Sequence, residues 1–235
     1  MKLSIIIPVY NEANTIKEVL DRVNNVDLSS LGLKKEIVVV DDGSKDGTQN
    51  VLLANAHAYA KLIIHEVNKG KGSAIRTGIA NSTGDIILIQ DADLEYNPDE
   101  YITVLTPIIH KKAEVVYGSR FLSQPHSSKQ KWAIPSHYLG NKFLSMLTSL
   151  LYFEPISDME TCYKAFKKEA LNGITLKAER FEFEPEITAK ILKKGIRILE
   201  VPISYKSRDY KEGKKIKWSD GLIAVWTLIK YRFVN

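Results

Sequence analysis

Short runs rich in isoleucine and valine alternate with amphipathic stretches along the first half of this 235-residue chain. The runs have the length and composition of strands that are buried on both faces, and they cover Leu3–Ile7, Glu36–Val40, Leu62–His65, Ile86–Gln90 and Glu114–Tyr117. Between the first two, apolar residues recur at helical spacing over Ile16–Val23, behind Asn14 or Thr15 as the expected N-cap. This alternation predicts βαβ units and an α/β fold with a mixed, mainly parallel sheet and helices on both faces.

The rest of the chain predicts further helices and two loops. The expected helices cover Gly70–Asn81, Pro98–Lys111, His137–Phe153, Phe183–Lys194 and Ser219–Arg232. We expect loops at Ser123–Ser136, which is polar with prolines at its edges, and at Lys206–Lys217, which is basic, and a strand at Ile196–Val201. Because no linker or repeat interrupts the chain, we expect a single domain over 1–235, with halves 1–120 and 121–235 sharing one sheet.

Composition narrows the class of protein. A single cysteine, Cys162, excludes an internal disulfide framework and a thiolate metal site, and is compatible with a reducing compartment. No segment has the roughly 18–20 uninterrupted apolar residues that span a bilayer, and the amino terminus lacks a signal-peptide pattern. The net charge of +5 fits a phosphate-bearing ligand or an anionic surface, and equally a generic basic surface. We expect a cytoplasmic protein with no nucleic-acid partner.

Asp91 and Asp93 are the strongest local signal for chemistry. They directly follow the apolar run Ile86–Ile89, and residues i and i+2 of an extended chain point the same way. Ligands of wound α/β sheets bind beyond the carboxyl ends of strands, where this pair falls. Two carboxylates that share a small site favour a hard divalent cation, and Glu95 could join them. Taken alone, the pattern is also compatible with a solvated acidic turn.

Polar clusters also follow the first two predicted strands. Pro8, Tyr10 and Glu12 come after the first, and Asp41 and Asp42 come after the second. Carboxylates at these positions could accept hydrogen bonds from a base or a ribose, and an aromatic ring could stack on a base. The second cluster is equally compatible with a turn that caps a helix.

The glycine-rich segment Gly70–Gly78 matches neither the dinucleotide fingerprint nor a P-loop, which makes a dehydrogenase a poor alternative. It opens a predicted helix, so we expect it to offer backbone N–H groups and Lys71 to a phosphate-bearing ligand.

Together, these residues resemble the family 2 glycosyltransferases of the GT-A fold, closest to the dolichyl-phosphate mannose or glucose synthase branch. The matching segments are Ile6–Glu12, Val40–Ser44, Asn68–Gly72, Asp91–Asp93, Gly118–Arg120, Asp158–Thr161 and Phe183–Glu186. The resemblance implies an inverting enzyme that moves a hexose from a nucleotide sugar of the GDP-mannose or UDP-glucose type to a polyprenyl phosphate. It also implies Mg²⁺ or Mn²⁺ on the donor diphosphate.

The resemblance assigns roles residue by residue. The residues implied to bind the nucleotide sugar are Pro8, Tyr10, Glu12, Asp41, Asp42, Lys71, Asp91 and Ala92, with Arg208 and Lys214 closing over its phosphates. Asp91 and Asp93 would hold the metal, whereas Glu95 stands where relatives often have glutamine. Arg120 would bind the acceptor phosphate, and Asp158 would act as a catalytic base or position the acceptor. Relatives often carry a second arginine near Pro135–His137, where this chain has none.

Two stretches indicate contact with the cytoplasmic face of a membrane. Residues 138–153 are rich in large apolar side chains, and 218–233 combine Trp218, Trp226 and Phe233 with flanking lysines and arginines. Packing on the sheet or in a dimer would explain the same pattern. Two other functions stay open: transfer to a polysaccharide or other hydroxyl acceptor, and a non-catalytic accessory subunit that binds nucleotide sugars.

Overall fold

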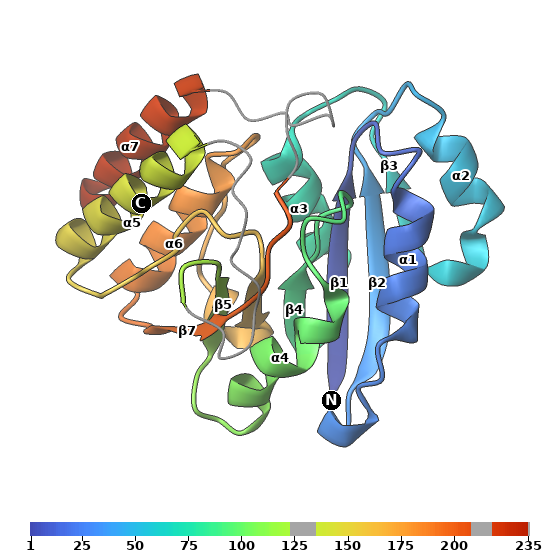
Figure 1. Ribbon diagram of the computed structural model, residues 1–235, viewed down its shortest axis with the longest axis horizontal. Coiled ribbons are helices and arrows are strands. Elements are labelled where there is room, and N and C mark those ends of the chain that lie inside the picture. Colours follow the sequence, from blue (N-terminus) through green and yellow to red (C-terminus); the bar gives the residue numbers. More distant parts are fainter. Residues whose placement is uncertain (123–134, 208–217, 235) are drawn as a thin grey trace.

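The computed structural model describes residues 1–122, 135–207 and 218–234, and its core is one seven-stranded β-sheet (Figure 1). The strands are β1 Lys2–Val9, β2 Lys34–Asp41, β3 Lys61–Ile64, β4 Ile86–Ile89, β5 Val115–Ser119, β6 Lys164–Lys167 and β7 Ile198–Pro202. They lie in the order β3-β2-β1-β4-β6-β5-β7, and β6 runs antiparallel to both of its neighbours while the other pairs are parallel. The predicted α/β fold with a mixed, mainly parallel sheet is confirmed.

Helices cover both faces of this sheet. They are α1 Ile16–Asn25, α2 Thr48–Ala54, α3 Lys71–Ala80, α4 Tyr101–Ile109, α5 Pro135–Tyr152, α6 Phe183–Lys193 and α7 Trp218–Phe233, with short 3-10 turns η1 Ser29–Leu31, η2 Ala56–Ala58, η3 Pro98–Glu100 and η4 Lys168–Leu171. One apolar core joins the sheet to α1 and α4, and a second joins it to α3, α5, α6 and α7. Ile5 and Ile7 belong to the first core and Ile6 to the second, because successive side chains of a strand alternate between its faces.

Two elements depart from the expectation. The sequence did not predict α2, nor β6, whose residues are Lys-Ala-Phe-Lys. Strand β6 forms because Phe166 enters the core and the buried ammonium of Lys164 is compensated by tertiary contacts. That ammonium lies 2.7 Å from Glu184 and 2.9 Å from the Met159 carbonyl. Since β4 pairs with β6, one sheet runs through both halves of the chain.

A buried carboxylate joins the amino-terminal strand to the turn before β4. Glu36 accepts hydrogen bonds from the Lys2 ammonium, the Ser4 hydroxyl and both the backbone N–H and the hydroxyl of Thr83. Burial by itself would raise the pKa of Glu36, but these hydrogen bonds lower it to about 2. The ionised side chain therefore stabilises the fold above its ordinary pKa of 4.5.

We expect Glu36→Gln to lower the free energy of unfolding at pH 7 by about 1–2 kcal/mol, a discounted figure because Lys2 is partly exposed. As the pH falls from 4.5 through 2, the wild type loses this contribution, so the two stability curves should converge in acid. Urea unfolding from pH 2 to pH 7 measures both curves. A constant difference across that range would contradict the prediction.

Candidate active site

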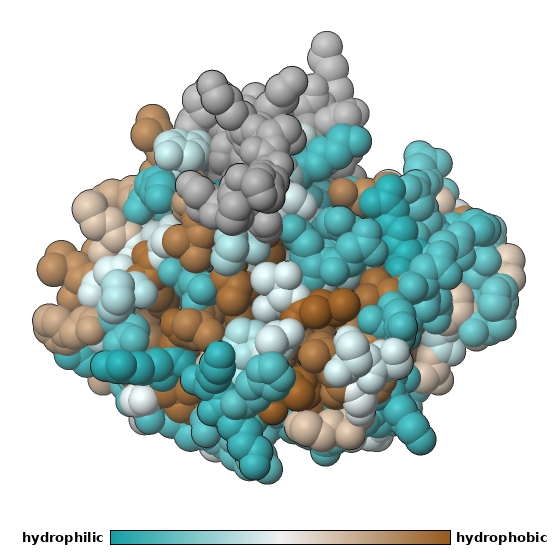
Figure 2. Space-filling model, turned by 60° about the horizontal axis from the view of Figure 1, so that its bottom comes forward, coloured by the Kyte–Doolittle hydropathy of each residue, from teal (hydrophilic) through white to brown (hydrophobic). Residues whose placement is uncertain are grey.

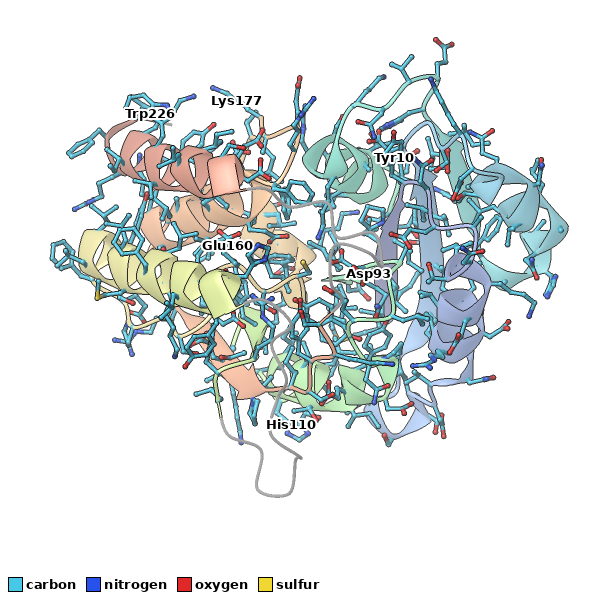
Figure 3. All side chains as sticks on the ribbon, turned by 45° about the horizontal axis from the view of Figure 1, so that its top comes forward. Tyr10, Asp93, His110, Glu160, Lys177 and Trp226 are labelled. Carbon is cyan, nitrogen blue, oxygen red and sulfur yellow. The ribbon has the colours of Figure 1, made fainter. Side chains whose placement is uncertain are left out.

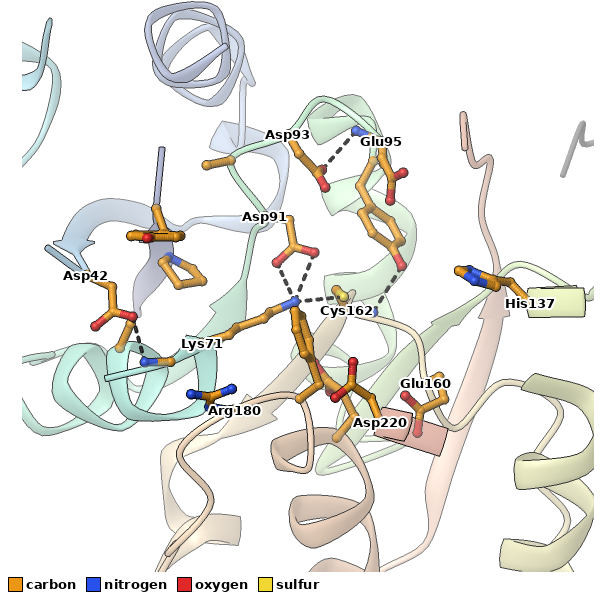
Figure 4. A pocket seen from close by; sticks show the side chains of 18 of the residues that line it. Asp42, Lys71, Asp91, Asp93, Glu95, His137, Glu160, Cys162, Arg180 and Asp220 are labelled. Atoms are coloured by element: carbon orange, nitrogen blue, oxygen red, sulfur yellow. Dashed lines mark hydrogen bonds and ion pairs between the residues drawn. The ribbon is translucent and has the colours of Figure 1, made fainter. Parts of the chain in front are cut away.

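A cavity of about 730 Å³ opens beside the carboxyl ends of β1, β4 and β5 (Figure 4). Its lining combines strand-end loops with the start of α3, the segment before α6, and residues of α5 and α7. The predicted site residues that line it are Pro8, Tyr10, Glu12, Asp42, Lys71, Asp91, Ala92, Asp93, Glu95 and Arg120. Residues from both halves of the chain meet here, as Figure 3 shows for Tyr10 and Asp93 on one side and Glu160 on the other.

The loops after β1 and β2 bind each other. Asn11, whose φ of 51° is left-handed, accepts a hydrogen bond from the Lys45 N–H and donates its own N–H to the Ser44 hydroxyl. Asp41 is fully buried, does not line the cavity, and accepts hydrogen bonds from the Ser44 N–H and the Gln49 amide. Asp41 thus holds the turn in place. Its predicted contact with a nucleoside stays a prediction.

Asp42 lines the cavity and also organises the loop before α3. Its carboxylate accepts the backbone N–H groups of Lys69 and Gly70 and lies 2.7 Å from Nδ1 of His65. The other ring nitrogen of His65 lies 3.0 Å from the Thr77 hydroxyl. The carboxylate therefore fixes the position of the glycine-rich segment relative to β2.

The turn after β4, called the acidic turn below, brings the three predicted metal ligands Asp91, Asp93 and Glu95 to the cavity wall. Asp93 accepts the backbone N–H of Glu95 at 3.2 Å, and Glu95 accepts the Tyr205 hydroxyl at 2.8 Å. Within the described residues, no group of three or more His, Cys, Asp and Glu side chains is arranged to hold a metal ion. Two carboxylates on one cavity wall still fit Mg²⁺, which proteins usually hold with one or two carboxylates plus water and substrate phosphates.

Buried tyrosines support this acidic turn from behind. Gln90 accepts the hydroxyls of Tyr101 and Tyr163, at 2.8 and 2.7 Å. Tyr163 stacks on Tyr96, and Tyr96 packs against Tyr205. From the other side, the Thr15 hydroxyl at the start of α1 lies 2.7 Å from the Ala92 carbonyl. The turn is therefore held rigidly, as a preorganised binding site requires.

Lys71 pairs with the acidic turn. Its Nζ lies 2.7 and 3.0 Å from the two carboxylate oxygens of Asp91 and 2.9 Å from Sγ of Cys162 (Figure 4). Burial by itself would lower the pKa of Lys71, but Asp91, Cys162 and Glu184 raise it well above its usual value. The ammonium therefore stays charged and compensates the Asp91 carboxylate.

The start of α3 differs from the expectation. Two of its first N–H groups are bonded within the protein: Gly72 and Ser73 donate to the carbonyls of Arg180 and Glu179. The glycines permit this contact, because a Cβ on Gly70 would lie 2.3 Å from the Glu179 carbonyl oxygen, and Gly70 has a φ of 97°. Two of the N–H groups that could bind a phosphate at this helix N-terminus are thus already bonded to protein carbonyls.

The same contact places Arg180 at the cavity, a residue that the sequence analysis missed. Arg180 is exposed and lines the cavity, close to Lys71 and Asp42 in Figure 4. Its guanidinium forms no hydrogen bond or ion pair with any part of the chain that the structure describes. Gly70 and Gly72 were the signal in the sequence for a close backbone contact. Spacing alone does not reveal that the partner of this contact lies about 110 residues later.

Arg120 and Asp158 form a buried pair. Asp158 is fully buried and accepts Nε and Nη2 of Arg120 at 2.7 Å each, together with the Arg120 backbone N–H at 2.8 Å. Arg120 lines the cavity and Asp158 does not. Burial would lower the pKa of Arg120, but Asp158 raises it well above its usual value. This geometry favours a positioning role for Asp158.

Two residues after Asp158, the same segment carries another carboxyl group, that of Glu160, to which the sequence assigned no role. Glu160 lines the cavity with Cys162 and with Glu184 of α6. His137, at the start of α5, also lines the cavity. It lies in the segment Pro135–His137, near which the resemblance implies a second arginine in relatives. The predicted phosphate-binding pair Arg208 and Lys214 lies outside the described residues, as does most of the loop Ser123–Ser136.

Comparison with known proteins identifies the family and agrees with the fold. Residues 4–175 match the model of the family "Glycosyl transferase family 2". The chain is 31% identical to the dolichol-phosphate mannosyltransferase of Pyrococcus furiosus over 216 residues, which cover 91% of this chain and 59% of that protein. It is 33% identical to the UDP-N-acetylglucosamine–dolichyl-phosphate N-acetylglucosaminyltransferase of Methanococcus voltae over 219 residues, covering 85% of this chain and 83% of that protein.

Among solved structures, glucosyl-3-phosphoglycerate synthase of Mycobacterium tuberculosis with Mn²⁺ and UDP-glucose superposes with a TM-score of 0.72. The match covers all of this chain and 80% of that one at 18% identity, so it speaks for the fold alone. This chain therefore belongs to glycosyl transferase family 2 and is a glycosyltransferase with the GT-A fold.

Proposed function

We propose that this glycosyltransferase moves a hexose, with inversion, from a GDP- or UDP-linked donor to a polyprenyl phosphate. One observation carries the proposal: an acidic turn and a buried arginine line the same cavity, from different halves of the chain. Carboxylates suit a cation that binds a diphosphate, and an arginine suits a second phosphate. The names of the Pyrococcus and Methanococcus relatives, which act on dolichyl phosphate, support this acceptor.

The donor would bind on the β1–β4 side. Tyr10 offers a ring to the base, and Asp91 and Asp93 would hold Mg²⁺ or Mn²⁺. Such an ion, when bound, neutralises charge that develops on the departing diphosphate. Lys71 and Arg180 add positive charge on the same wall, where charge-assisted hydrogen bonds to phosphate oxygens are strong.

The acceptor would bind on the β5 side. Arg120 would bind its phosphate, and Asp158 would hold the guanidinium of Arg120 in one orientation. A lipid phosphate is anionic at neutral pH, so its attack on the anomeric carbon needs no strong general base. This agrees with an Asp158 carboxylate that is withdrawn from the cavity.

The surface over α5 and α7 fits contact with a membrane. The two helices lie side by side (Figure 1), and apolar residues gather at this edge of the molecule in the space-filling view (Figure 2). Exposed residues there are Leu139, Phe143, Met146, Leu150, Phe153, Leu222, Ile223, Trp226 and Phe233. No helix of the described residues is long and apolar enough to cross a bilayer. We propose that this face lies on an anionic leaflet at the cytoplasmic side, helped by Lys142, Lys230 and Arg232.

Leu150→Glu should therefore weaken binding to vesicles that contain phosphatidylglycerol by about tenfold or more. Burial of a leucine side chain in an apolar environment contributes about 1.5–3 kcal/mol, and the variant loses this contribution from the apolar face. Vesicle sedimentation measures the change. Leu53→Glu is the matched control, since Leu53 lies on α2 and is 60% exposed against 70% for Leu150. Equal vesicle binding by the Leu150 and Leu53 variants would contradict the proposal that this face lies on a membrane.

The function is tested with a panel of UDP- and GDP-sugars, with and without Mn²⁺. One nucleotide class should raise the melting temperature only with the metal, and the matching labelled sugar should pass into an organic-extractable polyprenyl phosphate. Label in a water-soluble glycoside would favour a hydroxyl acceptor. Donor binding without hydrolysis or transfer would favour an accessory subunit.

A further inference from the structure

Among the described residues that line the cavity, carboxyl groups outnumber lysines and arginines. Each of three cations at or below its wall forms an ion pair of 2.7 Å with one carboxylate: Lys71 with Asp91, Arg120 with Asp158, and Lys164 with Glu184. Glu160 lines the same cavity and belongs to none of these pairs. Each pair is already neutral, so it compensates a charge on Glu160 only in part: Lys164 and Arg120 lower the pKa of Glu160, whereas Glu184 and Asp158 raise it.

Glu160 is oriented toward the ligand. It lines the cavity, across from the acidic turn in Figure 3, and Figure 4 shows its side chain between His137 and Asp220. Its Oε1 is buried and has no hydrogen-bond partner within the described parts of the chain. Buried polar atoms without a partner are rare in native proteins, and a bound ligand is one way to satisfy them.

We propose that Glu160 acts as a neutral carboxylic acid that donates a hydrogen bond to the phosphate of the acceptor bound at Arg120. The inference rests on the proposed polyprenyl phosphate acceptor. A phosphate oxygen only accepts hydrogen bonds, so the partner must be a donor, and a carboxylate would repel it. Arg120 and Glu160 would then contact one phosphate, the first by charge and the second by its proton.

The surroundings favour the protonated form. Burial raises the pKa of Glu160 most, and the nearby carboxylates of Glu184 and Asp158 raise it further, while Lys164 and Arg120 oppose them. The resulting pKa is about 7, compared with an ordinary value of 4.5. Other titratable groups that line the cavity include His137 of α5, Cys162 before β6, Asp220 of α7, Tyr96 and Tyr205. A bound phosphate anion would raise the pKa further.

The proposal predicts a pH-dependent KM for the acceptor. Below pH 7, Glu160 carries the proton and the hydrogen bond forms; above pH 7, it is a carboxylate and binding weakens. A single group with a pKa of about 7 predicts a KM that rises roughly tenfold between pH 6 and pH 8. The phosphate monoester of the acceptor also titrates, near pH 6. A control variant measured with the same acceptor therefore shows this background change without the titration of Glu160.

Glu160→Gln is that variant, because its amide has the same shape and donates a hydrogen bond at every pH. The experiment measures KM for a short-chain polyprenyl phosphate, with the donor that the wild type uses, from pH 6 to pH 8. E160Q should match the wild type at pH 6 and lack most of the tenfold rise. E160A should show the raised KM, about tenfold, already at pH 6, with kcat little changed.

Three results would overturn the proposal. The wild type and E160Q could share one pH profile, or E160A could bind the acceptor as well as the wild type. E160Q could instead lose more than a hundredfold in kcat while the wild-type rate rises with pH, which would make Glu160 a general base. Unchanged thermal shifts with the nucleotide sugar and Mn²⁺ show that each variant is folded. Failure of the proposed function looks different: the wild type would then label no polyprenyl phosphate at any pH.

Discussion

Replacing Asp93 with asparagine should lower the rate of sugar transfer about a thousandfold and leave the melting temperature of the free protein unchanged. The amide oxygen can still accept the N–H of Glu95, so the acidic turn keeps its shape. What disappears is one negative charge on the wall that faces the donor diphosphate. A metal ion contributes several kcal/mol of transition-state stabilisation, and each 1.4 kcal/mol is a factor of ten in rate.

Initial rates with saturating donor at several Mn²⁺ concentrations measure this effect, and the thermal shift by donor with Mn²⁺ should vanish together with the activity. Asp99→Asn is the matched control, because Asp99 is exposed, lies six residues away and does not line the cavity. Activity of the Asp93 variant within tenfold of the wild type would exclude the metal role. So would a thermal shift that needs no metal.

Asp158→Ala should lower the free energy of unfolding by about 3–5 kcal/mol, the usual effect of removing one partner of a buried ion pair. The substitution leaves the Arg120 guanidinium buried without its counter-charge and removes the acceptor of three N–H groups. Urea unfolding at pH 7 measures the loss. Transfer to the acceptor should fall as well, since Arg120 would no longer be held in one orientation.

The double variant Arg120→Met, Asp158→Leu separates stability from function. Apolar residues of similar volume often replace a buried ion pair without loss, so most of the stability should return. Acceptor binding should not return, because the cation is gone. If Asp158→Ala abolished transfer at full stability and with an unchanged KM for the acceptor, Asp158 would be a catalytic base.

Much of the donor side of the site followed from local sequence. Parallel strands end at the same edge of a sheet, so motifs that follow the first, second and fourth strands lie on one rim. The structure places Tyr10, Asp42 and Asp93 at one cavity, as predicted. The strands themselves were predictable because β-branched runs that are buried on both faces differ clearly from the helical periodicity between them.

Spacing could not reveal how the side chains are used. Asp41 has the same chemistry as Asp42 in the sequence, yet only Asp42 lines the cavity. The expected phosphate-binding start of α3 bonds instead to the segment at Arg180, and this is a contact between residues far apart in the chain. Strand β6 was missed because its lysine is buried only where Glu184 meets it.

The sequence by itself determined the class of fold, the rim of the sheet on which the polar motifs lie, and the residue types available there for a cation and a phosphate. These depend on short-range periodicity and on strand ends. Only the tertiary structure decided the pairing of charges. Lys71, Arg120 and Lys164 each lie beside a carboxylate from another part of the chain. None of these three pairs includes Glu160, whose Oε1 has no hydrogen-bond partner among the described residues. Electrostatic energy in a buried site depends on distances of a few ångströms, which long-range packing sets.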